Sequence, residues 1–210
     1  MLGRLRKLLG IISLTLTILL IVAMITFSIV NVEVRDEVPS IEKEGDVRVV
    51  ALISDTHIPS RTKRLPDRVF EVFRDADVII HAGDLTQIEV VRELEKVAPV
   101  VAVHGNMDPY EIRVELPEMD SVEVYGWKIG IIHDPGALWG MGEMKRIAKE
   151  NGFDVLVFGH THRQFVKWED DVLYVNPGSP TNPLPPMLVK PSVGLLFITE
   201  ESVEPLIIKA

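Results

Sequence analysis

The sequence VRVVALISDTH, residues 47–57, decides the fold of this chain. Its first eight residues are mostly apolar and β-branched, a pattern typical of a strand that is buried on both faces. Asp55, Thr56 and His57 follow this strand directly. Asp55 and His57 stand two residues apart, so in an extended chain their side chains face the same side and could hold one ion.

The same arrangement of an apolar strand followed by polar residues recurs four more times. The further strands are predicted at residues 77–81, 100–104, 128–133 and 154–159. The polar groups at their ends are Gly83-Asp84, Gly105-Asn106-Met107-Asp108, His133-Asp134 and Gly159-His160-Thr161-His162. Ligands of open α/β sheets bind at the carboxyl ends of the strands. The pattern therefore predicts that five strands bring carboxylate, amide and imidazole groups to one edge.

These groups have the chemistry of a metal site. Carboxylate, amide oxygen and imidazole together favour Mn, Fe, Zn, Ni or Co over Ca. Glycines at positions 83, 105 and 159 permit the sharp turns that bring backbone close to an ion. Taken singly, Asp-x-His, Gly-Asp and Gly-Asn are more often turns than ligands. Their occurrence in this order, together with Gly-His-Thr-His, is what favours a metal site.

The remaining pattern predicts an α/β sandwich that is parallel at first and antiparallel at the end. Helical spacing with charged outer faces is found at residues 66–73, 88–96 and 137–151. Shorter strands are predicted at residues 165–169, 172–176, 193–199 and 203–209. No internal repeat and no second globular domain is evident.

The amino-terminal segment predicts a membrane anchor. Leu8 to Val30 is an unbroken uncharged run, which as a helix would reach ~35 Å, enough for a bilayer core of ~30 Å. Its length and the lack of a cleavage site favour a retained anchor over a signal peptide, and the lack of a polar face argues against a buried core helix. We therefore predict a transmembrane anchor at residues 1–30, a polar tether at residues 31–46 and a globular domain at residues 47–210.

Charge predicts the orientation and limits the partners. Arg4, Arg6 and Lys7 precede the apolar run, so the positive-inside rule places the globular domain outside the cytoplasm. The formal net charge is -9, and residues 31–210 hold 19 basic against 31 acidic residues. A globular domain with this excess of acidic residues repels polyanions, so tight nucleic-acid binding is not expected. The absence of cysteine excludes disulfides, thiolate metal sites and cysteine nucleophiles.

The ordered motifs resemble the calcineurin-like metallophosphoesterase superfamily. The stretches HAGD, VHGNMD and NPGSPTNP resemble its compact archaeal and bacterial phosphodiesterase branch in particular. The resemblance covers roughly residues 47 to 210. It implies a four-layer α-β-β-α sandwich with two mixed sheets and a dinuclear metal site.

The resemblance also implies a role for seven residues. Asp55, His57 and His162 would hold one divalent ion, Asn106, His133 and His160 a second, and Asp84 would bridge both. Mn²⁺ is the first expectation for both ions, with Fe, Zn, Ni or Co as alternatives. A hydroxide that bridges the ions would hydrolyse a small phosphate ester, most typically a phosphodiester, without a protein nucleophile.

Three residues leave questions open. Met107 stands where much of the superfamily has a histidine, and methionine cannot donate a proton, which favours esters with good leaving groups. Asp134 stands where glycine is frequent, and could orient His133 or face solvent. His81 is either a donor behind the site or a hydrogen-bonded histidine at a strand end. A phosphomonoester or nucleotide substrate stays open, and so does a scaffold role like that of the retromer subunit of similar fold.

Overall fold

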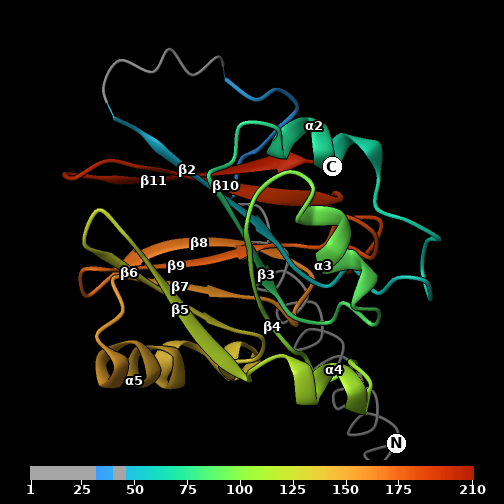
Figure 1. Ribbon diagram of the computed structural model, residues 1–210. Helices are drawn as coiled ribbons and strands as arrows, with labels where there is room; N and C mark the ends of the chain where they lie inside the picture. The colour runs from blue at the N-terminus through green and yellow to red at the C-terminus, as the bar shows by residue number, and fades with distance from the viewer. Residues whose placement is uncertain (1–31, 40–45) are drawn as a thin grey trace, which may run out of the picture. The chain divides into compact units, whose positions relative to one another are not determined.

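Two mixed β-sheets form the body of the protein in the computed structural model, which describes residues 32–39 and 46–210 (Figure 1). In spatial order the first sheet contains β1 (Val34–Arg35), β11 (Val203–Lys209), β10 (Ser192–Ile198), β2 (Arg48–Ile53), β3 (Val78–Ala82) and β4 (Val100–Val103). The second contains β5 (Met119–Val124), β6 (Trp127–Ile132), β7 (Val155–Phe158), β9 (Val172–Pro177) and β8 (Gln164–Glu169). The expected mixed α/β fold with two sheets is therefore confirmed.

Strand β2 shows why the first sheet is covered on both sides. Five of its six residues are buried. Val49, Ala51 and Ile53 pack with the helices on the outer face. Because side chains alternate along a strand, Val50 and Leu52 project to the opposite face, and both are fully buried. Apolar residues at every position are what such a strand needs.

Helices cover the outer face of each sheet. Helices α2 (Asp67–Phe73) and α3 (Glu89–Leu94) pack their apolar sides on the first sheet. Helix α5 (Met141–Asn151) packs Met144 and Ala148 on the second sheet, against Leu156, Phe158 and Tyr174. The layers therefore run α-β-β-α (Figure 1). The short helices α4 (Tyr110–Glu115) and η1 (Ala137–Trp139) lie in the connections.

The structure differs from the sequence prediction in several elements. Strands β1 and β5 and helix α4 were not predicted. The helix predicted over residues 137–151 is interrupted at Gly140, whose φ of 103° is incompatible with a helix. Strand β9 was expected to be antiparallel, and it is so toward β8, but it pairs parallel with β7. A central buried strand has two neighbours, and the hairpin partner fixes only one of them.

The transmembrane part of the predicted fold is corrected by the structure. Within residues 32–39 and 46–210, no helix is long and apolar enough to cross a membrane. The longest helix in that part, α5, has 11 residues, which corresponds to ~16 Å, about half of a bilayer core. The predicted span from Leu8 to Val30 lies outside the described residues. The predicted single-pass anchor, and the location outside the cytoplasm that depended on it, are therefore not supported.

Part of the predicted tether contributes to the first sheet. Val34 and Arg35 form β1 and pair parallel with Ile207 and Ile208 of β11. The backbone carbonyl of Asp36 accepts a hydrogen bond of 2.6 Å from the Arg68 guanidinium. The division of the chain at residues 30 and 46 remains a prediction.

Candidate metal centre

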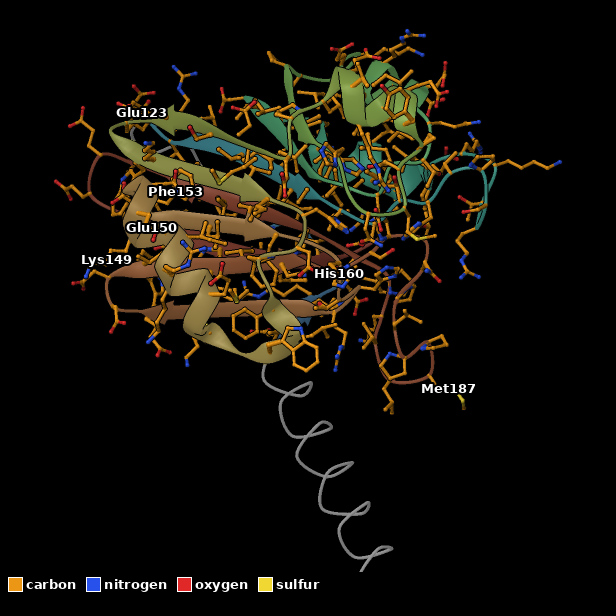
Figure 2. The ribbon with its side chains drawn as sticks, turned by 90° about the horizontal axis from the view of Figure 1, so that it is seen from below. Glu123, Lys149, Glu150, Phe153, His160 and Met187 are labelled. Carbon is orange, nitrogen blue, oxygen red and sulfur yellow. The ribbon has the colours of Figure 1, made fainter. Side chains whose placement is uncertain are left out.

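The loops after five strands meet at one end of the two sheets. In Figure 2, His160 marks this end, because it lies just past β7. Phe153 lies at the opposite end of that strand. Contacts among their residues bring the loops that follow β2, β3, β4 and β6 to the same place. The predicted edge is therefore formed by two sheets rather than one.

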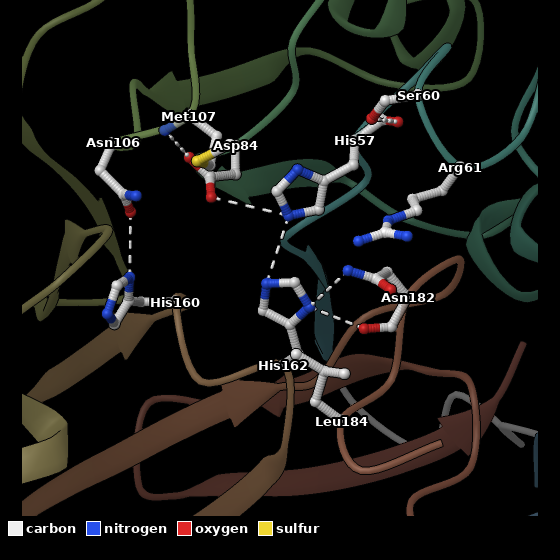
Figure 3. Close-up of a pocket in the computed structure, with 10 residues that line it drawn as sticks. All are labelled: His57, Ser60, Arg61, Asp84, Asn106, Met107, His160, His162, Asn182 and Leu184. Atoms are coloured by element: carbon white, nitrogen blue, oxygen red, sulfur yellow. Dashed lines mark hydrogen bonds and ion pairs between the residues drawn. The ribbon is translucent and has the colours of Figure 1, made fainter.

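A cleft of ≈ 420 Å³ opens between these loops (Figure 3). Its lining residues are His57, Ser60, Arg61, Asp84, Asn106, Met107, His160, His162, Asn182 and Leu184. Five of these were predicted as metal ligands. Ser60, Arg61, Asn182 and Leu184 were not singled out from the sequence, because residues that line a cleft without ligand chemistry follow no recognisable spacing.

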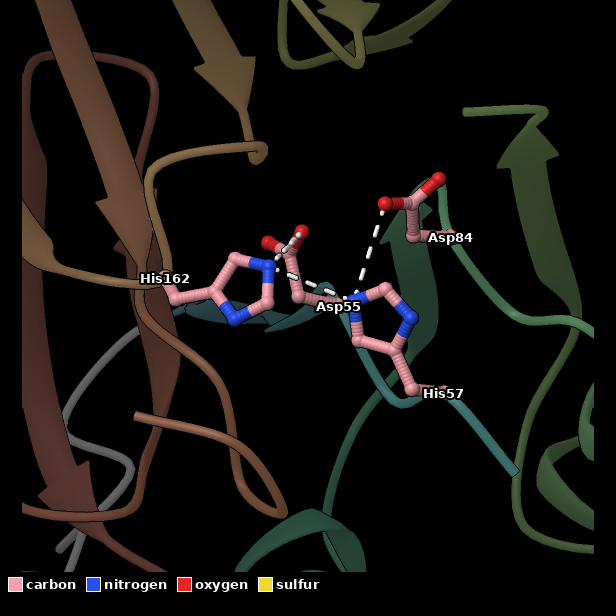
Figure 4. A group of neighbouring side chains, drawn as sticks. All are labelled: Asp55, His57, Asp84 and His162. Carbon is pink, nitrogen blue, oxygen red and sulfur yellow. Dashed lines mark hydrogen bonds and ion pairs between the residues drawn. The ribbon is translucent and has the colours of Figure 1, made fainter. Parts of the chain in front are cut away.

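Four predicted ligands form a buried cluster at the base of the cleft (Figure 4). The candidate ligand atoms of Asp55, His57, Asp84 and His162 all lie within 4.8 Å of one another. His162 Nε2 is 3.3 Å from Asp55 Oδ1 and 3.2 Å from His57 Nε2. His57 Nε2 is 3.6 Å from Asp84 Oδ2.

The other three predicted ligands form a second cluster beside the first. Asn106 Oδ1 is 3.0 Å from His133 Nε2 and 3.0 Å from His160 Nδ1. His133 Nε2 is also 3.3 Å from Asp84 Oδ2. Asp84 is thus in contact with both clusters, and all seven predicted residues are brought together.

The backbone at the centre is strained. Five of the seven residues are non-glycine residues in the left-handed region, with φ values of 54° for Asp55, 46° for His57, 56° for Asp84, 66° for His160 and 56° for His162. Each such residue costs on the order of 1–3 kcal/mol and persists where the surroundings over-determine it, typically at functional sites. The surrounding structure therefore holds these side chains toward a common point despite the cost of their backbone conformation.

Two glycines permit the close approach of the loops. A Cβ added at Gly83, whose φ is 88°, would lie 2.6 Å from His133 Nδ1. A Cβ added at Gly105 would collide with the carboxylate and the backbone nitrogen of Asp84. Any side chain at these positions would displace a predicted ligand.

Asp108 holds two of the loops together. Its buried carboxylate accepts hydrogen bonds from the backbone amides of Asp84 (3.0 Å), Thr86 (2.6 Å) and Gly105 (2.7 Å). Burial raises the pKa of this carboxyl, and the amide of Gly105 partly offsets the effect. The Arg113 guanidinium donates to the backbone carbonyl of Asp108 at 2.7 Å. Neither side chain was predicted to have a role at the site.

Outer partners orient three of the histidines. His133 Nδ1 donates to the Ala82 carbonyl at 2.8 Å, and His162 Nδ1 donates to the Asn182 carbonyl at 2.7 Å. His160 Nε2 lies 3.5 Å from Asp134 Oδ2. Of the two possibilities left open for Asp134, orientation of His133 is wrong, because Ala82 does this and Asp134 faces His160. Such partners fix the tautomer and ring direction of ligating histidines.

Charges in the centre are strongly coupled. Burial alone would lower the pKa of His133, but its bond to Asp84 raises the pKa to about 9. Burial alone would raise the pKa of Asp84, but the same bond holds it below its usual value. Burial raises the pKa of Asp55, and burial lowers the pKa of His57 to about 4. The centre therefore stabilises one positive charge next to Asp84.

His81 is a hydrogen-bonded histidine at a strand end. It is fully buried, its Nε2 lies 3.2 Å from Thr56 Oγ1, and its Nδ1 accepts from the Gly83 amide at 3.2 Å. Burial lowers its pKa to about 3, so the ring is neutral. His81 supports the loops behind the centre and does not line the cleft.

Comparison with known proteins agrees with this geometry. The family model for the calcineurin-like phosphoesterase superfamily domain matches residues 49–200. The chain belongs to the calcineurin-like phosphoesterase superfamily. This phosphoesterase is 41% identical over 164 residues to a probable metallophosphoesterase from Methanothermobacter thermautotrophicus, a match that covers 77% of the chain and 92% of the relative.

Two further proteins resemble the chain at lower sequence identity. A phosphodiesterase from Methanocaldococcus jannaschii is 31% identical over 145 residues, which cover 61% of this chain and 82% of the relative. The structure of vacuolar protein sorting 29 from Cryptosporidium parvum superimposes with a TM-score of 0.65 over 78% of this chain and 97% of that one. At 23% identity this last likeness shows the fold alone. Family membership makes the chain a metal-dependent phosphoesterase, and the cluster around Asp84 is suited to a metal ion.

Proposed function

We propose that this phosphoesterase hydrolyses phosphodiesters with two divalent metal ions that share Asp84. The first ion is assigned to Asp55, His57, Asp84 and His162, and the second to Asp84, Asn106, His133 and His160. The observation that carries the proposal is the way in which hydrogen-bond acceptors face one another in both clusters.

His133 shows this most clearly. Its Nδ1 donates to the Ala82 carbonyl, so in the neutral ring Nε2 is an acceptor. That acceptor faces Asp84 Oδ2 at 3.3 Å and Asn106 Oδ1 at 3.0 Å. Converging acceptors repel one another unless a positive charge lies among them, either a proton or a cation. The raised pKa of His133 reports the same requirement, with a proton in the place of the cation.

The first cluster repeats the arrangement around His162. Its Nδ1 lies 2.7 Å from the Asn182 carbonyl, which can only accept, and 3.1 Å from Asn182 Nδ2. The shorter contact assigns the proton to Nδ1, so Nε2 of the neutral ring is again an acceptor. It faces Asp55 Oδ1 at 3.3 Å and His57 Nε2 at 3.2 Å. Imidazole and carboxylate are the donors that Mn²⁺, Fe²⁺, Zn²⁺, Ni²⁺ and Co²⁺ accept, and we propose Mn²⁺ as the ion. Two acceptor clusters on either side of Asp84 support two ions rather than one.

Ions held by these residues would lower the pKa of a bound water and offset the charge of the phosphate. The chain's own contribution is to hold seven ligand groups in fixed directions. No protein nucleophile is needed: Ser60, the hydroxyl in the cleft, already donates to the His57 carbonyl at 2.7 Å. The thioether of Met107, 60% exposed beside Asn106, cannot protonate a leaving group.

The absence of a donor at Met107 favours esters whose leaving group departs without a proton. Aryl phosphodiesters meet this condition, whereas alkyl monoesters do not. The similarity to the phosphodiesterase from Methanocaldococcus jannaschii supports the same choice. Met107 thus favours good leaving groups, and the similarity to that phosphodiesterase is what supports a diester over a monoester with the same leaving group.

The test uses the full chain, stripped of metal by a chelator and reloaded with one metal at a time. Metal content and hydrolysis of bis(p-nitrophenyl) phosphate and p-nitrophenyl phosphate are then measured. We expect two Mn²⁺ per chain and faster turnover of the diester. The variant His133→Gln should lose one ion and turnover, while His104→Gln, a histidine outside both clusters, should keep both. Full turnover of the metal-free chain, or of His133→Gln, would refute the proposal.

A further inference from the structure

We propose that Arg61 binds a second anionic group of the substrate, a phosphate or a carboxylate other than the phosphate that is hydrolysed. The inference rests on the proposed function, because it takes the cleft beside the metal centre as the substrate site. It adds a substrate class to that function: phosphodiesters that carry a further negative charge.

Arg61 is presented to the cleft by a fixed backbone. Its amide donates to the His57 carbonyl at 3.0 Å, and the Ser60 hydroxyl donates to the same oxygen at 2.7 Å. The loop is thereby tied to a residue of the metal centre. Figure 3 shows the guanidinium beside His57 and Asn182, on the opposite side of His57 from Met107. A substrate in the cleft therefore has Arg61 at one side of the reacting phosphate.

The guanidinium of Arg61 has no partner among the residues that the structure describes. It makes no hydrogen bond or ion pair with residues 32–39 or 46–210. The next arginines in the chain differ: Arg64 pairs with Asp67 at 3.0 Å, and Arg68 pairs with Glu71 at 3.0 Å. In a chain with 31 acidic and 22 basic residues, carboxylates are plentiful. Since Arg61 lines the cleft without pairing with a carboxylate, all the N–H groups of its guanidinium can bind a ligand.

The chemistry of guanidinium selects the ligand. Its planar fork of N–H groups matches the two oxygens of a phosphate or a carboxylate. The hydrolysed phosphate is assigned to the metal centre, where the seven ligand residues converge. Arg61 follows His57 by four residues and lies at the edge of that centre, so it is placed for a group bonded to the phosphate rather than for the phosphate itself.

The test compares two diesters with the same leaving group. One is p-nitrophenyl phenyl phosphate, and the other carries a carboxylate on the phenyl ring. We expect a KM roughly twofold to fivefold lower for the carboxylate ester, the size of an ion pair made by an exposed arginine. Arg61→Gln should raise the KM of the carboxylate ester by the same factor, so that the KM values of the two esters become equal. Arg64→Gln, from the same segment but already paired with Asp67, should preserve the difference.

Binding supplies a readout that does not need turnover. Affinities of the manganese-loaded chain for phenylphosphonate and for 4-carboxyphenylphosphonate are measured by calorimetry, with the same two variants. Equal affinities in the wild type, or equal losses for both ligands in Arg61→Gln, would overturn the inference. The second result would mean that Arg61 contacts the phosphate itself. If neither diester is hydrolysed, the proposed function fails, while the phosphonates still decide the role of Arg61.

Discussion

Replacement of Gly105 by alanine should disrupt the metal centre and leave the rest of the protein folded. The added Cβ would lie 2.6 Å from the backbone nitrogen of Asp84 and 2.8 Å from its Cγ, whereas ordinary contacts begin at 3.4 Å. The shortfall at the nitrogen is about 0.8 Å. Because the obstacle includes backbone, rotation of a flexible side chain cannot relieve it, and the loop of Asp84 or that of Gly105 must move.

The expected size of the effect differs between stability and activity. Overpacking of this kind costs about 1–3 kcal/mol of unfolding free energy, which for a domain of this size lowers Tm by roughly 2–12 °C. A displacement near 1 Å at the shared ligand should reduce turnover on the order of 10²-fold. The variant should therefore remain folded at 25 °C while it loses metal and activity.

The assay combines a thermal melt, metal analysis and diester hydrolysis on the full chain. Gly142→Ala is the matched control, because no atom lies within 4 Å of its added Cβ and the residue is helical in α5. Alanine there should leave turnover unchanged and stabilise the helix by about 0.4–1 kcal/mol. Wild-type metal content and turnover in Gly105→Ala would refute the reasoning, since they would show that the two loops can separate without disturbing Asp84.

Three further substitutions test individual residues of the site. Asp84→Asn removes the charge between the clusters and should lose bound metal and turnover together, so retention of two ions by metal analysis would contradict the shared ligand. Met107→His restores a proton donor and should raise turnover of alkyl esters by up to about 10²-fold, and an unchanged ratio of alkyl to aryl rates would show that the ring does not reach the leaving group. Asp108→Asn turns a side-chain amide N–H toward backbone N–H groups and should lower the free energy of unfolding by about 1–3 kcal/mol, as measured by denaturant titration. Wild-type stability would mean that the three backbone amides find other acceptors.

The sequence predicted which side chains converge better than it predicted the topology. All seven predicted ligands converge, because each follows a strand whose apolar residues fix where the strand ends. Strand β5 could not be predicted, since its residues are half exposed at a sheet edge and show no apolar run. The parallel pairing of β9 with β7 was also missed, because strand neighbours depend on the packing of distant segments rather than on local sequence.

The second layer of the site escaped prediction for a related reason. Ala82 and Asn182 orient His133 and His162 through backbone carbonyls, and any residue type carries a carbonyl. A sequence pattern can therefore mark the ligand but not the group that selects its tautomer. Asp134 illustrates the limit from the other side: its identity attracted attention, yet adjacency in the chain pointed to His133, while the structure places it against His160.

The left-handed backbone of the ligand residues connects these observations. Asp55, His57 and Asp84 all adopt a positive φ. Asp and His enter this region more often than most non-glycine residues, but the residue type alone does not impose it. The conformation is maintained by bonds between loops, with the Asp55 amide donating to Gly83 and the His57 amide donating to Asp84, each at 3.0 Å. Each loop therefore depends on its neighbour for its shape. This mutual support explains why motifs that are ambiguous alone carry information together: the conformation of Asp55 and His57 rests on bonds to the loop of Asp84.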